Sequence, residues 1–241
     1  MEIRGANALI TGGAHRVGRG ITLALAAAGA NVFVHYGRSG AEATDTAAEA
    51  ERLGVVAATG SANLSDPSAA EGLVAAAAQS LGPLTILVNS ASGFPTDMLT
   101  DVTVDQLEST LRLSLLTPIM AAKAFAAQVV TDGAIVSVTD WRVHRPYPDH
   151  FSYTIAKGAL ETFTTAAAVA LAPRVRVNAV ALGAILPPPG QDSAYLKELA
   201  GTLPLKRTGS PALVGRAIVE LVGNDFVTGE TIRLDGGASL V

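Results

Sequence analysis

Two side chains in the segment FSYTIAKGALE are spaced for proton chemistry. Tyr153 and Lys157 are four residues apart at the start of an alanine-rich stretch. Four residues make about one helical turn, so both side chains lie on one face of a helix. An ammonium group near a phenol favours the phenolate and lowers its pKa, which improves proton exchange near neutral pH. The pair predicts an acid–base site.

A carboxylate, Asp140, precedes this pair by thirteen residues. An ionised carboxylate only accepts hydrogen bonds, and it would repel the oxyanion that forms when hydride reaches a ketone. A reduced pteridine suits it better, because amino and ring N–H groups donate hydrogen bonds and reduction of a C=N bond places the proton on nitrogen. Asp140 therefore favours a pteridine substrate.

A glycine-rich turn, TGGAHRVG, follows the first apolar run and precedes a predicted helix. Gly12, Gly13 and Gly18 would permit a tight turn and a close approach of the backbone to a pyrophosphate. The start of the helix attracts phosphate through its free N–H groups. This context predicts a dinucleotide cofactor.

The end of the second predicted strand reads HYGRSG and contains no acidic residue. An acid there would accept hydrogen bonds from the free ribose hydroxyls of NAD. Arg38 and Ser39 stand there instead, and Arg16 lies in the glycine turn, so two guanidinium groups and a hydroxyl are available to a 2′-phosphate. The predicted cofactor is NADPH.

Strand-length apolar runs alternate with longer alanine-rich stretches that must position these residues. Predicted strands are 6–11, 31–36, 55–60, 85–90, 133–138, 175–180 and 231–234, and predicted helices are 17–28, 41–53, 67–81, 104–130 and 151–171. Strand–helix–strand units give parallel strands with right-handed crossovers. We predict an α/β fold over 1–241: a Rossmann-type, doubly wound, seven-stranded parallel sheet flanked by helices on both faces, in a single domain.

Three irregular stretches follow predicted strands, at 92–100, 141–150 and 183–191. In a doubly wound sheet the ligand binds beyond the carboxyl ends of the strands. We therefore expect the three stretches to gather at the ligand edge of the sheet.

Composition excludes several other classes. The formal net charge of -4 has no acidic or basic block, which argues against nucleic acid and anionic lipid as partners. The absence of cysteine excludes disulfides and cysteine-bound metal and fits a cytoplasmic protein. The N-terminal apolar run is too short for a signal peptide core or a membrane span. No metal site is predicted.

The order of these parts resembles the short-chain dehydrogenase/reductase family over nearly the whole chain. Within it, HYGRS is similar to the HYHRS segment of pteridine reductases and NSASGF to their NNASSF, while TDW and LAPRVRVNAVALGAIL resemble dihydromonapterin reductases. The family normally has a serine where this chain has Asp140, and the pteridine subgroup has aspartate there. The resemblance implies an NADPH-dependent pteridine reductase with Tyr153 as proton donor.

The resemblance also implies roles for individual residues. Ser114 falls where the family has an asparagine that holds a water, and Phe94 would stack on the pterin with Ser92 nearby. Lys157 would also hold the nicotinamide ribose. The implied catalytic residues are Tyr153, Lys157, Asp140 and Ser114. The implied cofactor-binding residues are Gly12, Arg16, Val17, Gly18, Tyr36, Arg38, Ser39, Asn63, Leu64, Asn89, Ser90, Ala91, Tyr153 and Lys157, and the implied substrate-binding residues are Ser92, Phe94, Asp140 and Tyr153.

Three functions remain open on the sequence: a pteridine reductase, an NADPH-dependent reductase of aldehydes, ketones or sugars, and a catalytically weak NADPH-binding sensor. The family's Pro-Gly after the sixth strand is replaced by ALGAILPPPGQ, which predicts a divergent substrate lid. The family is commonly tetrameric, and the small residues of GALETFTTAAAVALA permit close helix packing. A homotetramer is therefore expected.

Overall fold

Seven parallel strands form one sheet in the computed structural model, which describes residues 1–129, 131–188, 190 and 192–241. The strands are β1 (Asn7–Thr11), β2 (Asn31–Tyr36), β3 (Ala57–Ser61), β4 (Ile86–Asn89), β5 (Gly133–Asp140), β6 (Val175–Leu182) and β7 (Thr231–Leu234). Their spatial order is β3-β2-β1-β4-β5-β6-β7. The order reverses between β1 and β4, so the sheet is doubly wound, as predicted.

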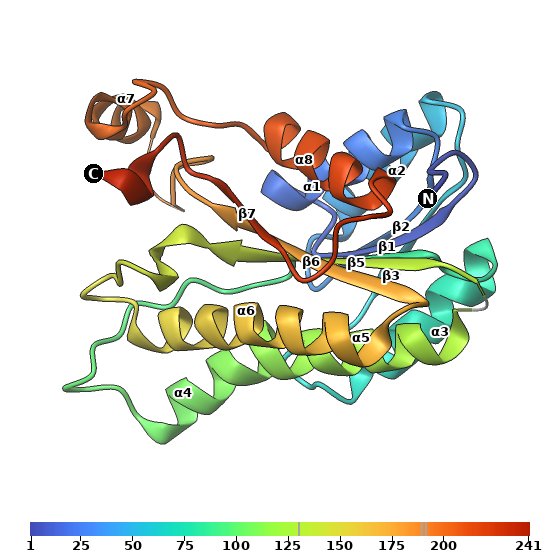
Figure 1. Cartoon of the computed structure of the whole chain (residues 1–241), viewed down its shortest axis with the longest axis horizontal. Helices are drawn as coiled ribbons and strands as arrows, with labels where there is room; N and C mark the ends of the chain where they lie inside the picture. The colour runs from blue at the N-terminus through green and yellow to red at the C-terminus, as the bar shows by residue number, and fades with distance from the viewer. Residues whose placement is uncertain (130, 189, 191) are drawn as a thin grey trace.

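Helices cover both faces of the sheet (Figure 1). One face carries α1 (Arg16–Ala27), α2 (Gly40–Arg52) and α8 (Pro211–Gly223), and the other carries α3 (Ala69–Leu81), α4 (Val104–Leu111), α5 (Thr117–Gln128) and α6 (Phe151–Leu171). A further helix, α7 (Ser193–Thr202), lies beside the C-terminus. The predicted fold class is confirmed.

Alternate residues of each strand enter different cores. Ile10 and Val34 pack with α1, α2 and α8, whereas Leu9 and Phe33 pack with α3 and α5. Successive side chains of a strand point to opposite faces of the sheet, and helices cover both faces. The central strands are therefore apolar at every position.

The central helical region is continuous but not uniform. The pattern predicts a helical region over 104–130, and the chain is helical from Val104 to Gln128 through α4, a π-helical turn, η1 (Arg112–Leu116), and α5; Val130 lies outside the described residues. Single π turns are frequent at functional sites. Two helices, α7 and α8, were not predicted, although Ser210 caps α8 and Pro211 occupies its first turn, which are ordinary start signals.

Loops that follow the strands gather at one edge of the sheet. Asp97, after β4, forms an isolated bridge with His150, after β5, and Arg16 donates to the carbonyl of Pro187, after β6. Pro189 and Gln191, in the predicted stretch 183–191, lie outside the described residues. The rest of the three predicted stretches does meet at the carboxyl ends of the strands.

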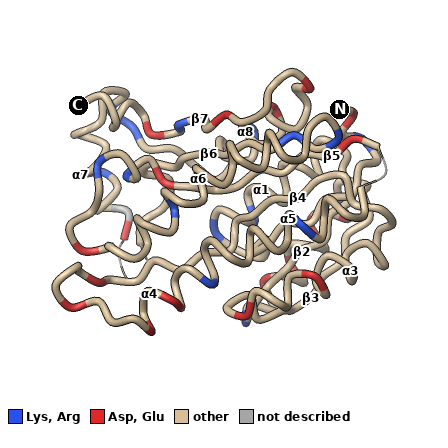
Figure 2. The backbone as a smooth tube through the Cα atoms, turned by 60° about the horizontal axis from the view of Figure 1, so that its bottom comes forward, with Lys and Arg blue, Asp and Glu red and all other residues tan. Residues whose placement is uncertain are grey.

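Positions of acidic and of basic residues are distributed along the backbone (Figure 2). No helix within the described ranges is long and apolar enough to cross a membrane. Nor do three His, Cys, Asp or Glu side chains gather as metal ligands would in that part of the chain.

Candidate active site

The glycine turn after β1 has no room for side chains at two positions. A Cβ at Gly18 would lie 1.9 Å from the carbonyl oxygen of Gly12, and a Cβ at Gly12, whose φ is +65°, would lie 3.0 Å from the Cα of Ala91. The turn is also tied to its neighbours, because Thr11 Oγ1 accepts hydrogen bonds from the N–H groups of Ser90 and Ala91. These contacts bring the ends of β1 and β4 together.

A groove of about 1030 Å³ runs over this turn. Predicted cofactor residues make up more than half of its lining: Gly12, Arg16, Val17, Gly18, Arg38, Ser39, Asn63, Leu64, Ser90 and Ala91. Ser92, predicted to bind substrate, lines it as well. The groove therefore joins the ends of β1 to β4 into a single concave surface.

Four predicted cofactor residues do not line this groove: Tyr153 and Lys157, which belong to α6, and Tyr36 and Asn89. Tyr36 packs against the core beside α2, where its ring lies 3.3 Å from the position of a Cβ at Gly40. Asn89 is buried, and its Nδ2 donates to Ser137 Oγ at 3.4 Å. Both residues support the backbone under the groove instead of facing into it.

His35 lines the groove and was missed by sequence reasoning. Its Nδ1 accepts the N–H of Gly12 at 3.0 Å, and its Nε2 lies 3.1 Å from the carbonyl oxygen of Ala62. Burial lowers the pKa of His35, against the hydrogen bond to Ala62, so the neutral ring with a proton on Nε2 suits both contacts. The sequence feature that could have identified His35 as a groove residue is its position next to Tyr36 at the end of β2.

The groove is positively charged. Its lining includes Arg16 and Arg38 and no acidic residue among those the structure describes. Arg16 has a left-handed φ of 53°, which is costly for a residue with a side chain, and its guanidinium donates to the carbonyl of Pro187 at 2.5 Å. Arg38 is exposed on the β2–α2 loop. Both guanidinium groups are thus available at the groove, and their role toward a 2′-phosphate stays a prediction.

Asp140 and Tyr153 meet beyond the end of β5. Tyr153 Oη donates to Asp140 Oδ2 at 3.0 Å, and the N–H of Arg142 donates to Asp140 Oδ1 at 2.8 Å. The strand runs two residues further than predicted, to Asp140, so the carboxylate stands at the sheet's edge facing the first turn of α6.

Lys157 is buried one turn along α6. Its Nζ donates to the carbonyl oxygen of Val138 at 2.8 Å and lies 5.6 Å from the centre of the Tyr153 ring. The two side chains do share one helical face, as their spacing predicts. The ammonium, however, is bound to the β5 backbone and not to the phenol.

Burial dominates the pKa values of this centre. It raises the pKa of Asp140, against the Arg142 and Tyr153 hydrogen bonds and the positive charges nearby, and it lowers the pKa of Lys157 to about 8. Burial and then the charge of Asp140 raise the pKa of Tyr153 well above its usual value. The pKa of Tyr153 is therefore raised and not lowered as the spacing from Lys157 predicts, because burial, and after it the charge of Asp140, dominates at this phenol.

Ser114 lies in η1 and is buried. Its Oγ is 3.3 Å from Ser92 Oγ, which links η1 to the groove. Lys157 Nζ donates its hydrogen bond to the carbonyl of Val138, and no hydrogen bond connects Lys157 to Ser114 among the described residues. The role of Ser114 in a proton relay stays a prediction.

Phe94 belongs to an aromatic cluster over Tyr153. Its ring stacks on His150 with centroids 3.8 Å apart and meets the Tyr153 ring edge-on at 4.8 Å. Tyr147 closes the cluster, 5.6 Å from Phe94. Phe94 thus lies beside Tyr153, while its stacking on a pterin stays a prediction. Tyr147 and His150 join the cluster, although no sequence spacing assigned them a role.

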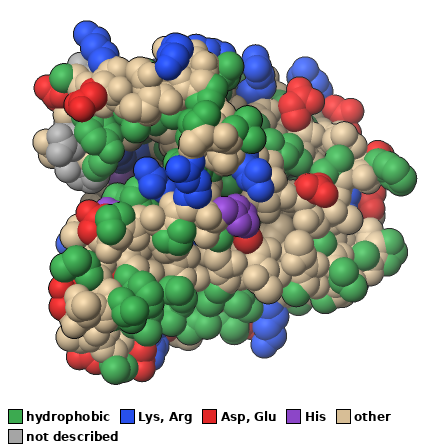
Figure 3. Space-filling view, turned by 60° about the vertical axis from the view of Figure 1, so that its left-hand side comes forward, with side chains coloured by type: hydrophobic (Ala, Val, Ile, Leu, Met, Phe, Trp, Pro, Cys, Tyr) green, Lys and Arg blue, Asp and Glu red, His purple; other side chains and the backbone are tan. Residues whose placement is uncertain are grey.

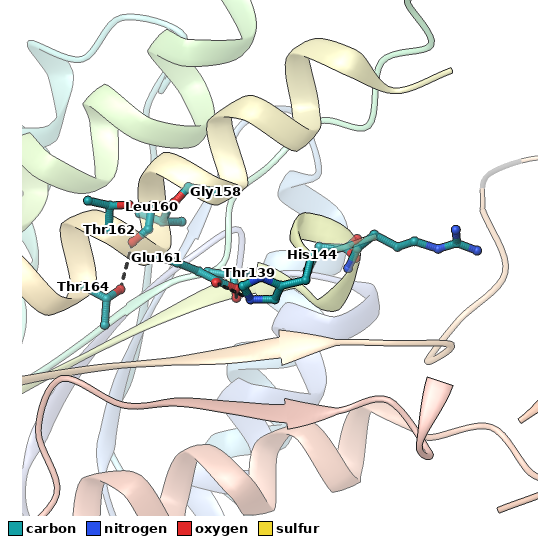
Figure 4. Close-up of polar contacts among 9 residues, drawn as sticks. Thr139, His144, Gly158, Leu160, Glu161, Thr162 and Thr164 are labelled. Carbon is teal, nitrogen blue, oxygen red and sulfur yellow. Dashed lines mark hydrogen bonds and ion pairs between the residues drawn. The ribbon is translucent and has the colours of Figure 1, made fainter. Parts of the chain in front are cut away.

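Glu161 ties the end of β5 to α6 (Figure 4). Its Oε1 accepts from Thr139 Oγ1 at 3.1 Å, and its Oε2 lies 3.4 Å from His144 Nε2. Thr139 immediately precedes Asp140, and Glu161 follows Lys157 by one turn. This contact holds the strand that carries the carboxylate against the helix that carries Tyr153 and Lys157.

Known proteins share this architecture over the whole chain. A family model described as enoyl-(acyl carrier protein) reductase matches residues 12–239. The solved structure of FolM alternative dihydrofolate reductase 1 from Brucella canis, complexed with NADP, is similar with a TM-score of 0.95 and 34% identity, covering 100% of this chain and 96% of that one.

Sequence relatives have varied activities. L-rhamnose 1-dehydrogenase (NAD(P)(+)) of Sphingomonas sp. (strain SKA58) is 30% identical over 98% of this chain and 96% of its own length. L-xylulose reductase of Bos taurus is 31% identical over 98% of both chains. Oxidation or reduction of a substrate is the chemistry that both names share, and the first of them also names NAD(P)(+).

Proposed function

This chain belongs to the short-chain dehydrogenase/reductase family, as the sequence predicted, and from that premise we propose that it reduces a pteridine with NADPH. It is an oxidoreductase. The groove fits the cofactor in three respects: its volume, the glycines that let backbone approach a pyrophosphate, and the arginines with no acid beside them. NADP is also the cofactor named for the similar FolM structure.

The observation that carries the pteridine proposal is the hydrogen bond from Tyr153 Oη to Asp140 Oδ2. The carboxylate adjoins the proton donor, where a substrate must lie to receive that proton. A ketone reduced there would develop an oxyanion against Asp140, whereas a pterin would offer N–H donors to it. Phe94, which contacts Tyr153, supplies an apolar ring for a planar heterocycle to stack on.

NADPH bound in the groove would supply a hydride, for which the acceptor would be the carbon of a ring C=N bond. Tyr153 gives its hydroxyl proton to the nitrogen of that bond, so carbon and nitrogen each gain one hydrogen. The raised pKa of Tyr153 keeps the phenol protonated before transfer. Lys157, charged below its pKa of about 8, stabilises the phenolate that remains.

A carbonyl compound is the second candidate substrate. It is favoured by the names of two relatives, L-rhamnose 1-dehydrogenase and L-xylulose reductase. The raised pKa of Asp140 also favours a carbonyl substrate, because a protonated carboxyl group donates a hydrogen bond to a carbonyl oxygen as a serine hydroxyl does.

An assay of NADPH oxidation with dihydrobiopterin, dihydrofolate and a set of aldehydes, ketones and sugars separates these candidates. We expect turnover with the dihydropterins. Turnover with carbonyl compounds only would overturn the pteridine proposal, and tight NADPH binding without any turnover would favour a sensor.

Two variants refine the test. Tyr153→Phe removes the proton and should lower kcat by about a hundredfold or more while NADPH still binds. Asp140→Ser replaces the acceptor by a donor, and we expect it to lower pterin turnover and raise carbonyl turnover. An Asp140→Ser protein that keeps its pterin activity would show that the carboxylate does not select the substrate.

A further inference from the structure

A second hollow, of about 280 Å³, lies between the loop after β5 and α7. Apolar side chains form most of its wall: Trp141, Leu199, Leu203, Ala238 and Val241. Its two charged side chains are Arg142 and Arg145. Figure 3 shows the side of the molecule on which α7 lies, where Lys and Arg side chains gather at the middle of a hollowed face.

Neither arginine forms a salt bridge among the described residues, although the Asp140 carboxylate, which accepts the backbone N–H of Arg142, is close enough for its charge to act on the Arg142 guanidinium. Arg142 lies over the rings of Trp141 and Tyr147, with its Cζ 4.8 and 4.7 Å from their centres. Arg145 makes one long hydrogen bond, 3.5 Å, to the carbonyl of Ala238. Within the described ranges no Asp or Glu carboxylate is within 4.0 Å of either guanidinium. Such cations, beside an apolar wall, attract an anionic group.

This hollow adjoins the proposed active site. The N–H of Arg142 donates to Asp140, while its side chain lines the hollow. On the other side, Tyr147 touches both Arg142 and Phe94. A molecule whose ring lies at Asp140 and Phe94 could therefore extend past Tyr147 to the arginines.

We infer that this hollow binds the carboxylate-bearing tail of the substrate, with Arg142 and Arg145 as its specificity-determining residues. The inference rests on the proposed pteridine reduction. It names the substrate class as a dihydropterin with an apolar, anionic substituent, in preference to one with a short neutral substituent. The apolar wall suits an aromatic linker, and the guanidinium groups suit its terminal carboxylates.

The kinetic test compares two substrates that share the ring and differ in the tail, dihydrofolate and 7,8-dihydrobiopterin. In Arg142→Gln and in Arg145→Gln, the kcat/KM for dihydrofolate divided by the kcat/KM for 7,8-dihydrobiopterin should fall about tenfold. This is the loss expected for one charge-assisted hydrogen bond. Arg174→Gln is the control, because this exposed arginine precedes β6 at the opposite edge of the sheet. A ratio that is unchanged in both test variants, or equally lowered in the control, would overturn the inference.

A binding measurement separates this inference from the proposed function. Trp141 is the only tryptophan of the chain and lines the hollow, so its fluorescence reports occupancy. The tail fragment p-aminobenzoylglutamate should change the emission and bind about tenfold more weakly to Arg145→Gln. Binding of the fragment without reduction of either pterin would refute the pteridine reaction but leave the anion subsite. Reduction of both pterins with no fragment binding and no change in the ratio would refute the subsite alone.

Discussion

Asp140 uses each carboxylate oxygen for a different purpose. Oδ1 accepts the backbone N–H of Arg142, which fixes the side chain's orientation, and Oδ2 accepts the Tyr153 hydroxyl. A carboxylate has about four lone-pair positions, so acceptor capacity remains for substrate N–H groups. The same residue can thus orient the proton donor and bind the substrate.

We expect loss of the Lys157 charge to cause a fall in kcat/KM at alkaline pH. Burial lowers its pKa to about 8, so the ammonium is present at neutral pH and is lost as the pH rises through about 8. Without that charge the Tyr153 phenolate is less stable, and kcat/KM should fall. Tyr153 itself titrates higher, because its pKa is raised.

This prediction is tested by measuring kcat/KM for a dihydropterin across the alkaline range. A profile that stays flat through about pH 8 would mean that Lys157 does not act through its charge. Lys157→Arg keeps the charge at high pH, and any residual activity in that variant should lack this alkaline fall.

We expect the charge of Arg38 to favour NADPH over NADH. Replacement by Asp removes a positive charge from the groove lining and introduces repulsion toward a 2′-phosphate, while the new acid can accept ribose hydroxyls. Binding titrations should show NADPH affinity lower by about tenfold or more, and NADH affinity changed much less.

The matched control is Arg52→Asp, at the far end of α2, which should leave the ratio of the two affinities unchanged. Equal losses for both cofactors in Arg38→Asp would refute the assignment of this residue to the 2′-phosphate.

At the scale of elements, Glu161 joins β5 to α6. In Glu161→Ala the hydroxyl of Thr139, which is 2% exposed, loses its acceptor, and an unsatisfied buried group costs about 1–3 kcal/mol. The contact with exposed His144 contributes less, about 0–1 kcal/mol. Urea denaturation should therefore show a lower free energy of unfolding.

Glu161→Gln is the comparison, since its amide oxygen can still accept from Thr139. It should lose less than about 1 kcal/mol. If Gln and Ala destabilise the protein equally, the carboxylate charge and not the Thr139 contact is what stabilises this junction.

At the scale of the whole molecule, α6 leaves apolar side chains in contact with solvent. Val169 is 82% exposed and Ile155 is 47% exposed. They are fourteen residues apart, about four turns, and so lie on the same helical face. We propose that this face packs against a second copy of the chain in the homotetramer that the family resemblance implies.

Val169→Glu should then lower the mass measured by light scattering, because a charge would be buried in the contact. Val56→Glu, at another exposed valine (57%) before β3, is the control and should leave the mass unchanged. A monomeric parent protein, or a Val169→Glu variant with the parent's mass, would refute this interface.

The sequence by itself determined the features that depend on local pattern. The seven strands follow from strand-length apolar runs, the glycine turn from glycines between a predicted strand and helix, and the shared face of Tyr153 and Lys157 from their spacing of four residues. Family resemblance placed Asp140 and Phe94 in the site. Helix α8 was readable too, from Ser210 and Pro211.

Only the tertiary structure decided the contacts between segments distant in sequence. Lys157 bonds to Val138, Phe94 meets His150, and Arg142 reaches the hollow beside α7. Burial, which reverses the predicted direction of the Tyr153 pKa, exists only once those segments are packed. Residue spacing specifies which face of an element a side chain occupies; the solvent and charges around that side chain depend on which other elements cover it.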